Sequence, residues 1–409
     1  MLKVRSVDWK LVLLKQNPFP EVPPRTPAEA VWAGMSRLKD QFNTLFVEAL
    51  STSATQVVLN RGDWGSGKTH AAIYFGTRDR LPRVKGEQVR DVCILYVRTP
   101  KDPSQADTIL YRNILEVIQF GRLRQIIRDV IAEHGVQNAL GKLQNVVESE
   151  ALGKALWLLG LEKNGTGQLR LFGDDEGPDE WQRLLEAYFF SQHTKTDLKR
   201  LELSRGIDNS QDRFRILGGV LQCLTGLAPV EEIEHRSRVL LWIDEMEDLI
   251  YFTSRQYRPF TQGLRDLIDR LSGYFTLFMN FTLAEPEVLG DIGLILGGAL
   301  MDRITHQIYF QQPNEEEAYQ YAIELLDAFR TQAPQDLGLP PTYPFSEESL
   351  KEIIRMLSKR TPREINKRCS EIITNALMKG AISAAGKGII SMDFVAELDK
   401  DRLDLEFRC

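Results

Sequence analysis

The stretch VVLNRGDWGSGKTHAAIYF, Val57–Phe75, decides how the rest of the sequence is interpreted. It contains the spacing G-x-x-x-x-G-K-[ST] over Gly62–Thr69, with an apolar run before it and a helical pattern after it. Glycines in such a loop let backbone N–H groups approach a phosphate, and the N-terminus of the following helix adds positive potential. The stretch therefore predicts a strand–loop–helix unit that binds a nucleotide.

The loop also predicts ATP and Mg²⁺ as cofactors. Lys68 is expected to neutralise the β- and γ-phosphate oxygens, and Thr69 to place its hydroxyl on Mg²⁺. His70 comes directly after the loop, and a position on the helix surface is a simple alternative for it. The expected nucleotide-binding residues of this segment are Gly62, Asp63, Trp64, Gly65, Ser66, Gly67, Lys68, Thr69 and His70.

A second motif lies in RVLLWIDE, residues 238–245, where an apolar run ends in two acidic residues. Asp244 is expected to bind nucleotide-bound Mg²⁺, directly or through water. Glu245 is expected to polarise the attacking water as a general base. The simpler alternative is that the acidic pair only begins a loop, and Glu247 and Asp248 are expected to continue it in solvent.

A polar residue interrupts the next apolar run, YFTLFMNFT at 274–282. Asn280 would cost free energy there unless it is hydrogen-bonded. Beside the acidic strand it would orient the attacking water and sense the γ-phosphate, with Thr282 as the second choice. A purely structural asparagine is the alternative.

Five apolar runs without alternation predict an α/β fold with a parallel five-stranded sheet covered by helices on both faces. The expected strands are 55–60, 91–99, 238–245, 274–282 and 305–311. Residues 16–28 are proline-rich and expected to be extended, within an extended N-terminal segment at 1–28. Residues 29–312 are expected to form the nucleotide-binding core, with a large helical insertion at about 105–235, and 313–409 to form a helical lid.

The composition argues against several classes of protein. The 409 residues are 43% hydrophobic and 26% charged, which is typical of a soluble globular protein. A net charge of −6 argues against a broad basic field for nucleic acid. No window approaches the roughly 18 apolar residues of a membrane span. Four dispersed cysteines argue against a zinc site or a disulfide framework, so a cytoplasmic location is expected.

Taken together, the phosphate loop, the Asp-Glu strand, the polar residue on the next strand and the helical lid resemble an AAA+ ATPase. The resemblance covers about 30–100 and 236–409 and favours the initiator-like group, which includes origin-recognition, transposon target-selection and bacterial defence ATPases. It implies that Arg303, in GGALMDRITHQIYF, is an arginine finger acting on a neighbouring subunit, and that Arg363, in TPREIN, is a lid sensor. It also offers Phe19 for the adenine pocket, with packing on the core as the alternative, and Thr99 as a contact of Glu245.

The resemblance implies ATP hydrolysis at subunit interfaces, in a homo-oligomeric ring or filament of six or seven subunits. The expected role is a nucleotide switch that assembles on double-stranded DNA and recruits or regulates an effector protein, in transposition, replication or phage defence. The basic lid segment 351–368 offers one DNA-facing surface, with an ordinary solvated helix as the alternative. A protein-remodelling or signalling ATPase without DNA contact is the second class, and a kinase-like transferase the third.

Overall fold

The computed structural model describes residues 7–85, 89, 91–163, 169–171, 180–226, 237–251, 253–271, 273–282 and 289–406. The chain divides into two compact units, which are described separately. The first comprises residues 1–42, 62–75 and 309–409, and the second 43–61 and 76–308. The phosphate loop thus groups with the C-terminal helices, which the sequence did not indicate.

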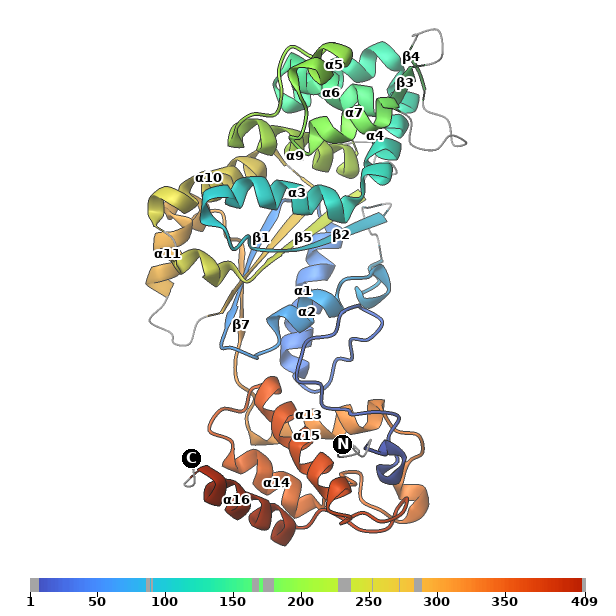
Figure 1. Cartoon of the computed structure of the whole chain (residues 1–409), viewed down its shortest axis with the longest axis vertical. Helices are drawn as coiled ribbons and strands as arrows, with labels where there is room; N and C mark the ends of the chain where they lie inside the picture. Colours follow the sequence, from blue (N-terminus) through green and yellow to red (C-terminus); the bar gives the residue numbers. More distant parts are fainter. Residues whose placement is uncertain are drawn as a thin grey trace. The chain divides into compact units, whose positions relative to one another are not determined.

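The second unit is built on a five-stranded sheet (Figure 1), whose strand order is β2-β5-β6-β1-β7. β2 pairs with β5 in parallel, and β5 pairs in parallel with β6. The five strands are β1 (Gln56–Gly62), β2 (Asp91–Arg98), β5 (Ser237–Asp244), β6 (Phe275–Thr282) and β7 (His306–Phe310). The α/β fold class expected from the sequence is confirmed.

The sheet order separates the two motif-bearing strands. β6 lies between β1, which leads into the phosphate loop, and β5, which ends in Asp244. Almost every residue of β5 and β6 is buried, as expected for strands with helices on both faces. Because parallel strands end at one edge of a sheet, polar side chains at their carboxyl ends come together.

Helices cover the sheet and extend beyond it. α3 packs on β2, α9 packs on β5, and α10 packs on α3 and α9. The helices of this unit outside the insertion are α10 (Ser254–Arg270), α11 (Leu289–Leu296) and α12 (Gly298–Met301). Short 3-10 turns lie at Arg78–Arg80, Pro103–Gln105 and Met246–Tyr251. α1 (Ser36–Ser51) contributes Phe46, which lies 5.8 Å from Phe278 of β6 between ring centroids.

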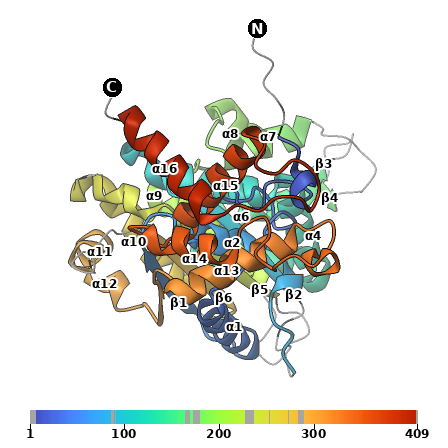
Figure 2. The ribbon, with the colours of Figure 1, turned by 90° about the horizontal axis from the view of Figure 1, so that it is seen from below.

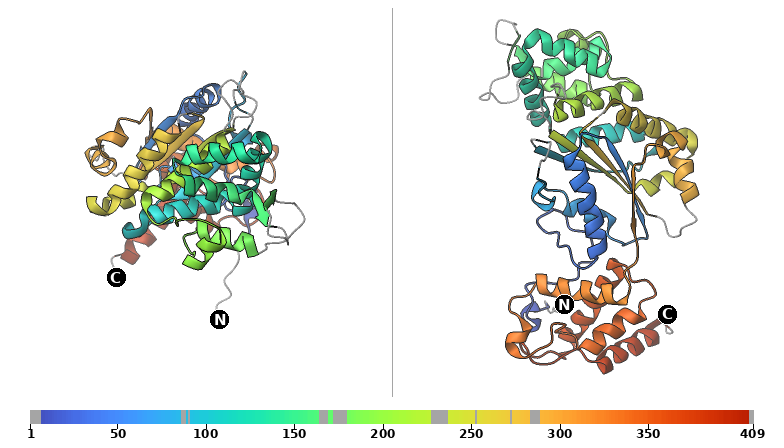
Figure 3. Two further views of the ribbon diagram at one scale, coloured as in Figure 1. Left: turned by 90° about the horizontal axis from the view of Figure 1, so that it is seen from above. Right: turned by 180° about the vertical axis from the view of Figure 1, so that it is seen from behind.

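The stretch between β2 and β5 is helical, as expected, and its helices gather in one group (green in Figure 3). One apolar cluster runs without interruption from the sheet into these helices, so the insertion shares the core of the sheet. The insertion also contains a small antiparallel hairpin of β3 (Leu161–Lys163) and β4 (Leu169–Leu171), which the expectation of a helical insertion did not include. The helices are α3 (Ala106–Ile118), α4 (Phe120–His134), α5 (Val136–Val147), α6 (Glu150–Leu159), α7 (Glu180–Phe189), α8 (Lys195–Arg200) and α9 (Ser210–Thr225).

The first unit has its own apolar core, formed mainly by the C-terminal helices (orange to red in Figure 2). The N-terminal segment joins this core. It forms a 3-10 turn at Trp9–Val12, and Leu14 makes a β-bridge with Arg330. The elements of this unit are α2 (Lys68–Tyr74), α13 (Glu315–Ala328), a 3-10 turn at Pro334–Leu337, α14 (Glu347–Met356), α15 (Pro362–Met378) and α16 (Met392–Glu406).

Among the described residues, no helix combines the length and the apolar character that crossing a membrane requires.

Candidate nucleotide-binding site

The phosphate loop needs glycine at two positions for reasons of space. A Cβ on Gly62 would lie 2.7 Å from Cβ of Phe310. Gly65 has φ +73°, and a Cβ there would lie 2.5 Å from Cβ of Arg363. Both distances are closer than carbon atoms tolerate, so a side chain at either position would displace the loop or its neighbours.

Lys68 is held inside the loop. Its Nζ donates to the carbonyl oxygens of Gly62 and Asp63, each at 2.9 Å, and to Oγ of Ser66 at 3.2 Å. The side chain is buried, and Thr69 follows it in the first turn of α2. A glycine-lined cradle with a central ammonium group fits the phosphates of a nucleotide.

Asp63 connects the loop to the C-terminal helices. Its Oδ2 accepts from Nζ of Lys359 at 2.8 Å and from Nε2 of Gln312 at 3.3 Å. Its Oδ1 accepts from the backbone N–H of Trp64 at 2.8 Å. Burial raises the pKa of Asp63, but the hydrogen bonds from Lys359 and Trp64 outweigh it, so the net pKa is lowered.

Arg363 lies beside the loop, in the first turn of α15. Thr361 caps this helix by accepting from the N–H of Glu364, and Pro362 occupies its first position, where no N–H is needed. The N–H of Arg363 donates to the carbonyl oxygen of Gly65 at 3.3 Å. The predicted lid sensor and the phosphate loop are therefore in direct contact.

Two further residues suggested by the sequence turn away from the loop. Nε2 of His70 lies 2.9 Å from the carbonyl oxygen of Val31, and burial lowers the pKa of His70 although this contact opposes it. The neutral ring donates to Val31, so His70 makes a structural contact in place of the solvent-facing helix position that was the alternative. Phe19 is fully buried in the core of the first unit, so it takes the packing role and not an open place beside a base.

The acidic centre of the second unit is a chain of hydrogen bonds across four strands. Nδ2 of Asn60 donates to Oδ1 of Asn280 at 2.9 Å, and Nδ2 of Asn280 donates to Oδ1 of Asp244 at 3.0 Å. The hydroxyl of Tyr96 donates to Oδ2 of Asp244 at 2.8 Å. The chain runs from β1 through β6 and β5 to β2, in the order of the sheet. Asp244 is thereby fixed in place at both oxygens.

Glu245 differs from its neighbour in backbone and environment. Its φ of +60° is a left-handed conformation that costs a non-glycine residue free energy, which is typical of functional sites. Oε1 lies 4.0 Å from Nε of Arg98. Oε2 is buried and has no hydrogen-bond partner among the described residues. Glu245 thus has an oxygen available for a proton or a water molecule.

The surroundings of the acidic pair differ from expectation in two ways. Nε of Arg98 lies 4.0 Å from Glu245, whereas the Thr99 hydroxyl donates to the backbone carbonyl of Asp244 at 2.8 Å; among the described residues, no hydrogen bond joins Thr99 to Glu245. Glu247 is buried and not solvated, because its Oε2 accepts from the N–H of Thr282 at 3.0 Å. It fixes the end of β6 beside the acidic centre.

The guanidinium of Arg303 is hydrogen-bonded to residues of its own unit. Its Nε and Nη2 donate to the two carboxylate oxygens of Asp269, on α10, at 2.6 and 2.7 Å. Its Nη1 donates to the carbonyl oxygen of Ala299 at 2.6 Å. Asp269, and not the adjacent Asp302, accepts these hydrogen bonds from the guanidinium.

The donor set fits Mg²⁺ held mainly by nucleotide and water. Among the described residues, no group of three or more His, Cys, Asp or Glu side chains forms a metal-binding cluster. Mg²⁺ commonly takes one or two carboxylate or hydroxyl ligands and completes its shell with phosphate oxygens and water. Within the second unit, the Asp244 carboxylate is an oxygen group of this kind, and Oε2 of the adjacent Glu245 has no hydrogen-bond partner among the described residues.

Most of the basic side chains of the lid segment 351–368 are neutralised. Each of five has a carboxylate within ion-pair distance: Lys351 with Glu347, Arg355 with Glu352, Lys359 with Asp63, Arg360 with Glu315, and Arg368 with Glu371 and Asp399. In the described part of the chain, only Arg363 and Lys367 of this set lack a carboxylate partner. The structure therefore favours the ordinary solvated helix over a DNA-facing surface here.

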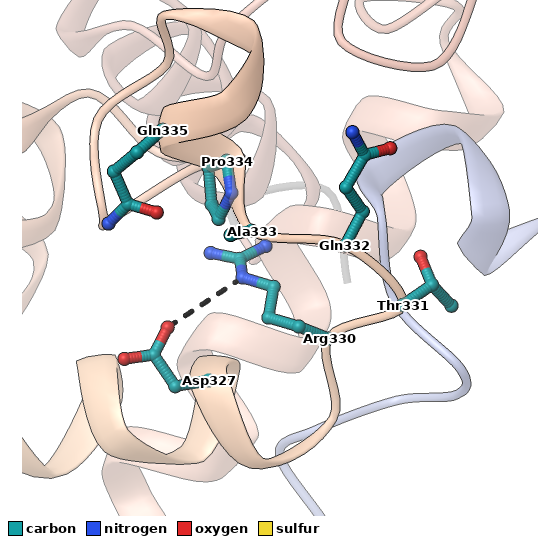
Figure 4. Close-up of a pocket in the computed structure, with 7 residues that line it drawn as sticks. All are labelled: Asp327, Arg330, Thr331, Gln332, Ala333, Pro334 and Gln335. Atoms are coloured by element: carbon teal, nitrogen blue, oxygen red, sulfur yellow. Dashed lines mark ion pairs between the residues drawn. The ribbon is translucent and has the colours of Figure 1, made fainter.

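A separate shallow pocket lies at the end of α13 (Figure 4). Its lining includes Asp327, Arg330 and Gln335 but no residue of the phosphate loop. Arg330 donates to the carbonyl oxygens of Val12, Pro341 and Tyr343, and burial lowers its pKa to about 10. Arg330 is thus an attachment point for the N-terminal segment, and the pocket belongs to that attachment.

Comparisons with known proteins find similarity in structure. No protein-family model matches the sequence, and no curated protein matches it. Drosophila ORC bound to DNA is 12% identical with a TM-score of 0.45, over 94% of this chain and 65% of that one. The Walker-type ATPase of Pyrococcus abyssi is 13% identical with a TM-score of 0.43, over 96% and 78%.

A third structure is the ADP form of ORC2 from Aeropyrum pernix, 11% identical with a TM-score of 0.47, over 94% of this chain and 72% of that one. Because the match covers 65% of the Drosophila ORC chain, this chain spans less than two thirds of that protein's length. At these identities the similarity concerns the fold alone.

The sequence missed four residues that the site uses: Asn60, Tyr96, Arg98 and Lys359. Asn60 had a readable signal, because it is a polar residue ending an apolar strand, like Asn280. Tyr96 and Arg98 occupy ordinary strand positions, and Lys359 is one of many lid cations. Only the sheet register, and the placement of the turn between α14 and α15 where Lys359 lies, give these three their partners.

Proposed function

We propose that this chain is an ATPase that binds ATP with Mg²⁺ and hydrolyses it. The observation that carries the proposal is the hydrogen-bond chain Asn60–Asn280–Asp244–Tyr96. Asn60 lies two residues before Gly62 in the sequence, so the strand that leads into the phosphate loop carries the first member of the chain. Nucleotide hydrolysis requires both a phosphate cradle and a fixed acidic group.

Some residues of the site would bind the nucleotide and the metal, and others would transfer a proton. The loop N–H groups and Nζ of Lys68 would hold the β- and γ-phosphates, and Thr69 and Asp244 would hold the metal. Mg²⁺, when bound, neutralises charge on the phosphate oxygens. Oε2 of Glu245 would accept a proton from the attacking water, and the Asn280 amide would orient that water.

Two arginines are proposed to stabilise the charge that develops on the transferred phosphoryl group. Arg363 would act from the lid of the same subunit, which its contact with Gly65 supports. Arg303 would act on the nucleotide of a neighbouring copy, because its guanidinium is partly exposed and fixed at the end of α12. Hydrolysis would then depend on assembly of a homo-oligomer.

The ATPase is proposed to assemble on double-stranded DNA in a nucleotide-dependent way and to recruit an effector protein there. The support is the initiator-like form of the motifs, together with one exposed surface. Arg255 and Arg258 lie on the exposed side of α10, and among the described residues neither has a carboxylate partner. These two arginines offer phosphate contacts that the neutralised lid segment does not.

The hydrolytic claim is tested by phosphate release from ATP without any acceptor. Wild type is expected to release phosphate and Lys68→Ala is not, whereas a kinase-like transferase would require an acceptor. The DNA claim is tested by retention on duplex DNA with and without a non-hydrolysable ATP analogue. Retention that depends on the analogue and is lost in Arg255→Glu/Arg258→Glu supports it. Equal, negligible retention in all cases would leave the protein-remodelling or signalling ATPase as the better account.

A further inference from the structure

The guanidinium of Arg303 is held in a way that leaves part of its donor set available. A guanidinium has five N–H donors, one on Nε and two on each terminal nitrogen. Asp269 receives one bond from Nε and one from Nη2, and Ala299 receives one from Nη1. One donor therefore remains on each terminal nitrogen. The side chain is 30% exposed, so these donors face a surface and not the core.

Asp269 is placed to serve as a fixed support. It lies near the C-terminal end of α10, whose preceding turns pack on α3 and α9, while Arg303 follows α12. The bidentate geometry fixes both the position and the plane of the guanidinium. Asp269 Oδ2 also lies 3.5 Å from Nε of Arg265, one helical turn earlier, so the carboxylate has cations on two sides. Its pKa is lowered, first by the hydrogen bond from Arg303.

We infer that Asp269 is a positioning residue for Arg303, holding the guanidinium side-on so that its remaining donors are presented to a phosphate bound by a second copy of the chain. This inference rests on the proposed role of Arg303 between subunits. A long arginine side chain that is already oriented loses less freedom when it meets the transferred phosphoryl group. The support would therefore act on the rate of hydrolysis and leave nucleotide binding unchanged.

Two other roles for the pair give different results. If Asp269 sequestered Arg303, its removal would release the arginine and accelerate hydrolysis. If the pair only tied α12 to α10, its removal would lower the melting temperature while kcat per folded molecule stayed the same. Asp266 is the matched control, because it lies on the same exposed side of α10 and near Arg303 but makes no hydrogen bond to it among the described residues.

The experiment compares Asp269→Ala, Asp269→Asn and Asp266→Asn in the full chain, measuring kcat, ATP affinity and melting temperature. Both Asp269 variants are expected to lose about 10-fold or more in kcat with unchanged ATP affinity, and Asp266→Asn to match wild type. Asp269→Asn keeps the shape of the side chain, but its amide N–H group replaces the oxygen that accepts from Nη2 of Arg303. Asp269→Ala/Arg303→Ala is expected to be no slower than Arg303→Ala.

Faster hydrolysis in the Asp269 variants, or an unchanged kcat with a lower melting temperature, would overturn the inference. So would equal losses in Asp269→Asn and Asp266→Asn. If Arg303→Ala itself hydrolyses ATP normally, the proposed role of Arg303 fails and the inference with it. If Arg303→Ala is slow while both Asp269 variants are normal, only the inference fails.

Discussion

The amide of Asn280 donates to the carboxylate of Asp244 at 3.0 Å, across the adjacent strands β6 and β5. Both residues are almost completely buried, and the Asn280 carbonyl is occupied in turn by Asn60. A buried carboxylate is tolerable only when hydrogen bonds replace the water it has lost. Asn280 therefore contributes to the stability of the sheet as well as to its proposed part in hydrolysis.

Asn280→Ala is expected to destabilise the second unit by about 1–3 kcal/mol, because Asp244 and Asn60 each lose a buried partner. Hydrolysis should fall as well. Chemical denaturation followed by a probe in the second unit measures the first effect. Asn138→Ala, on the exposed side of α5, is the control and should change stability by less than about 0.5 kcal/mol. Equal effects of the two variants would contradict the account.

Glu245→Gln is expected to bind ATP with unchanged affinity but to hydrolyse it about 100-fold more slowly or worse, because an amide cannot accept the proton of the attacking water. Binding of a fluorescent ATP analogue and single-turnover hydrolysis separate the two steps. Arg98→Ala serves as a companion variant, since it removes the contact with Glu245 but keeps the carboxylate. Near-normal turnover of Glu245→Gln would remove Glu245 from the role of general base.

Lys359→Met is expected to weaken the contact between the phosphate loop and the turn before α15 by breaking the ion pair with Asp63. Because Lys359 is half-exposed, the coupling energy should be small, about 0.2–1 kcal/mol, and should shrink with added salt. A double-mutant cycle with Asp63→Asn, read as ATP affinity, measures it. Lys351→Met breaks a comparable pair with Glu347 within α14 and should not change ATP affinity. A coupling of zero at low salt would show that the pair does not link the loop to the lid.

His70 predicts a dependence of stability on pH. Its pKa in the folded protein lies below the usual 6.5, so the unfolded chain binds more protons as the pH falls below that value. The first unit should therefore lose stability as the pH falls from about 7.5 through 6.5 toward the lowered pKa of the folded state. His70→Gln keeps a donor for Val31 but stays neutral, so its melting temperature should fall less over the same range. If the melting temperatures of wild type and His70→Gln change with pH in parallel, His70 does not contribute to the pH dependence of stability.

Local patterns in the sequence predict much of this arrangement. The phosphate loop is predictable from Val57–Phe75, and the acidic strand from RVLLWIDE, because glycine spacing and buried apolar runs are local features. Asn280 was predictable because a polar residue inside an apolar strand needs a partner. Tyr96 and Asp269 were not, because a tyrosine on a strand and an aspartate on an exposed helix face are ordinary. Their roles come from strand register and from the packing of α10 near Arg303, which link residues far apart in the sequence.

Mixing two inactive variants tests most directly whether the site is completed by a neighbouring copy. Lys68→Ala lacks a working loop but keeps Arg303, and Arg303→Ala keeps the loop but lacks the arginine. In an equimolar mixture, random assembly would give roughly a quarter of interfaces with both parts intact. We expect ATP hydrolysis to reappear at about that fraction of the wild-type rate, although neither variant hydrolyses ATP alone. Mixed assemblies that form but stay inactive would contradict the account.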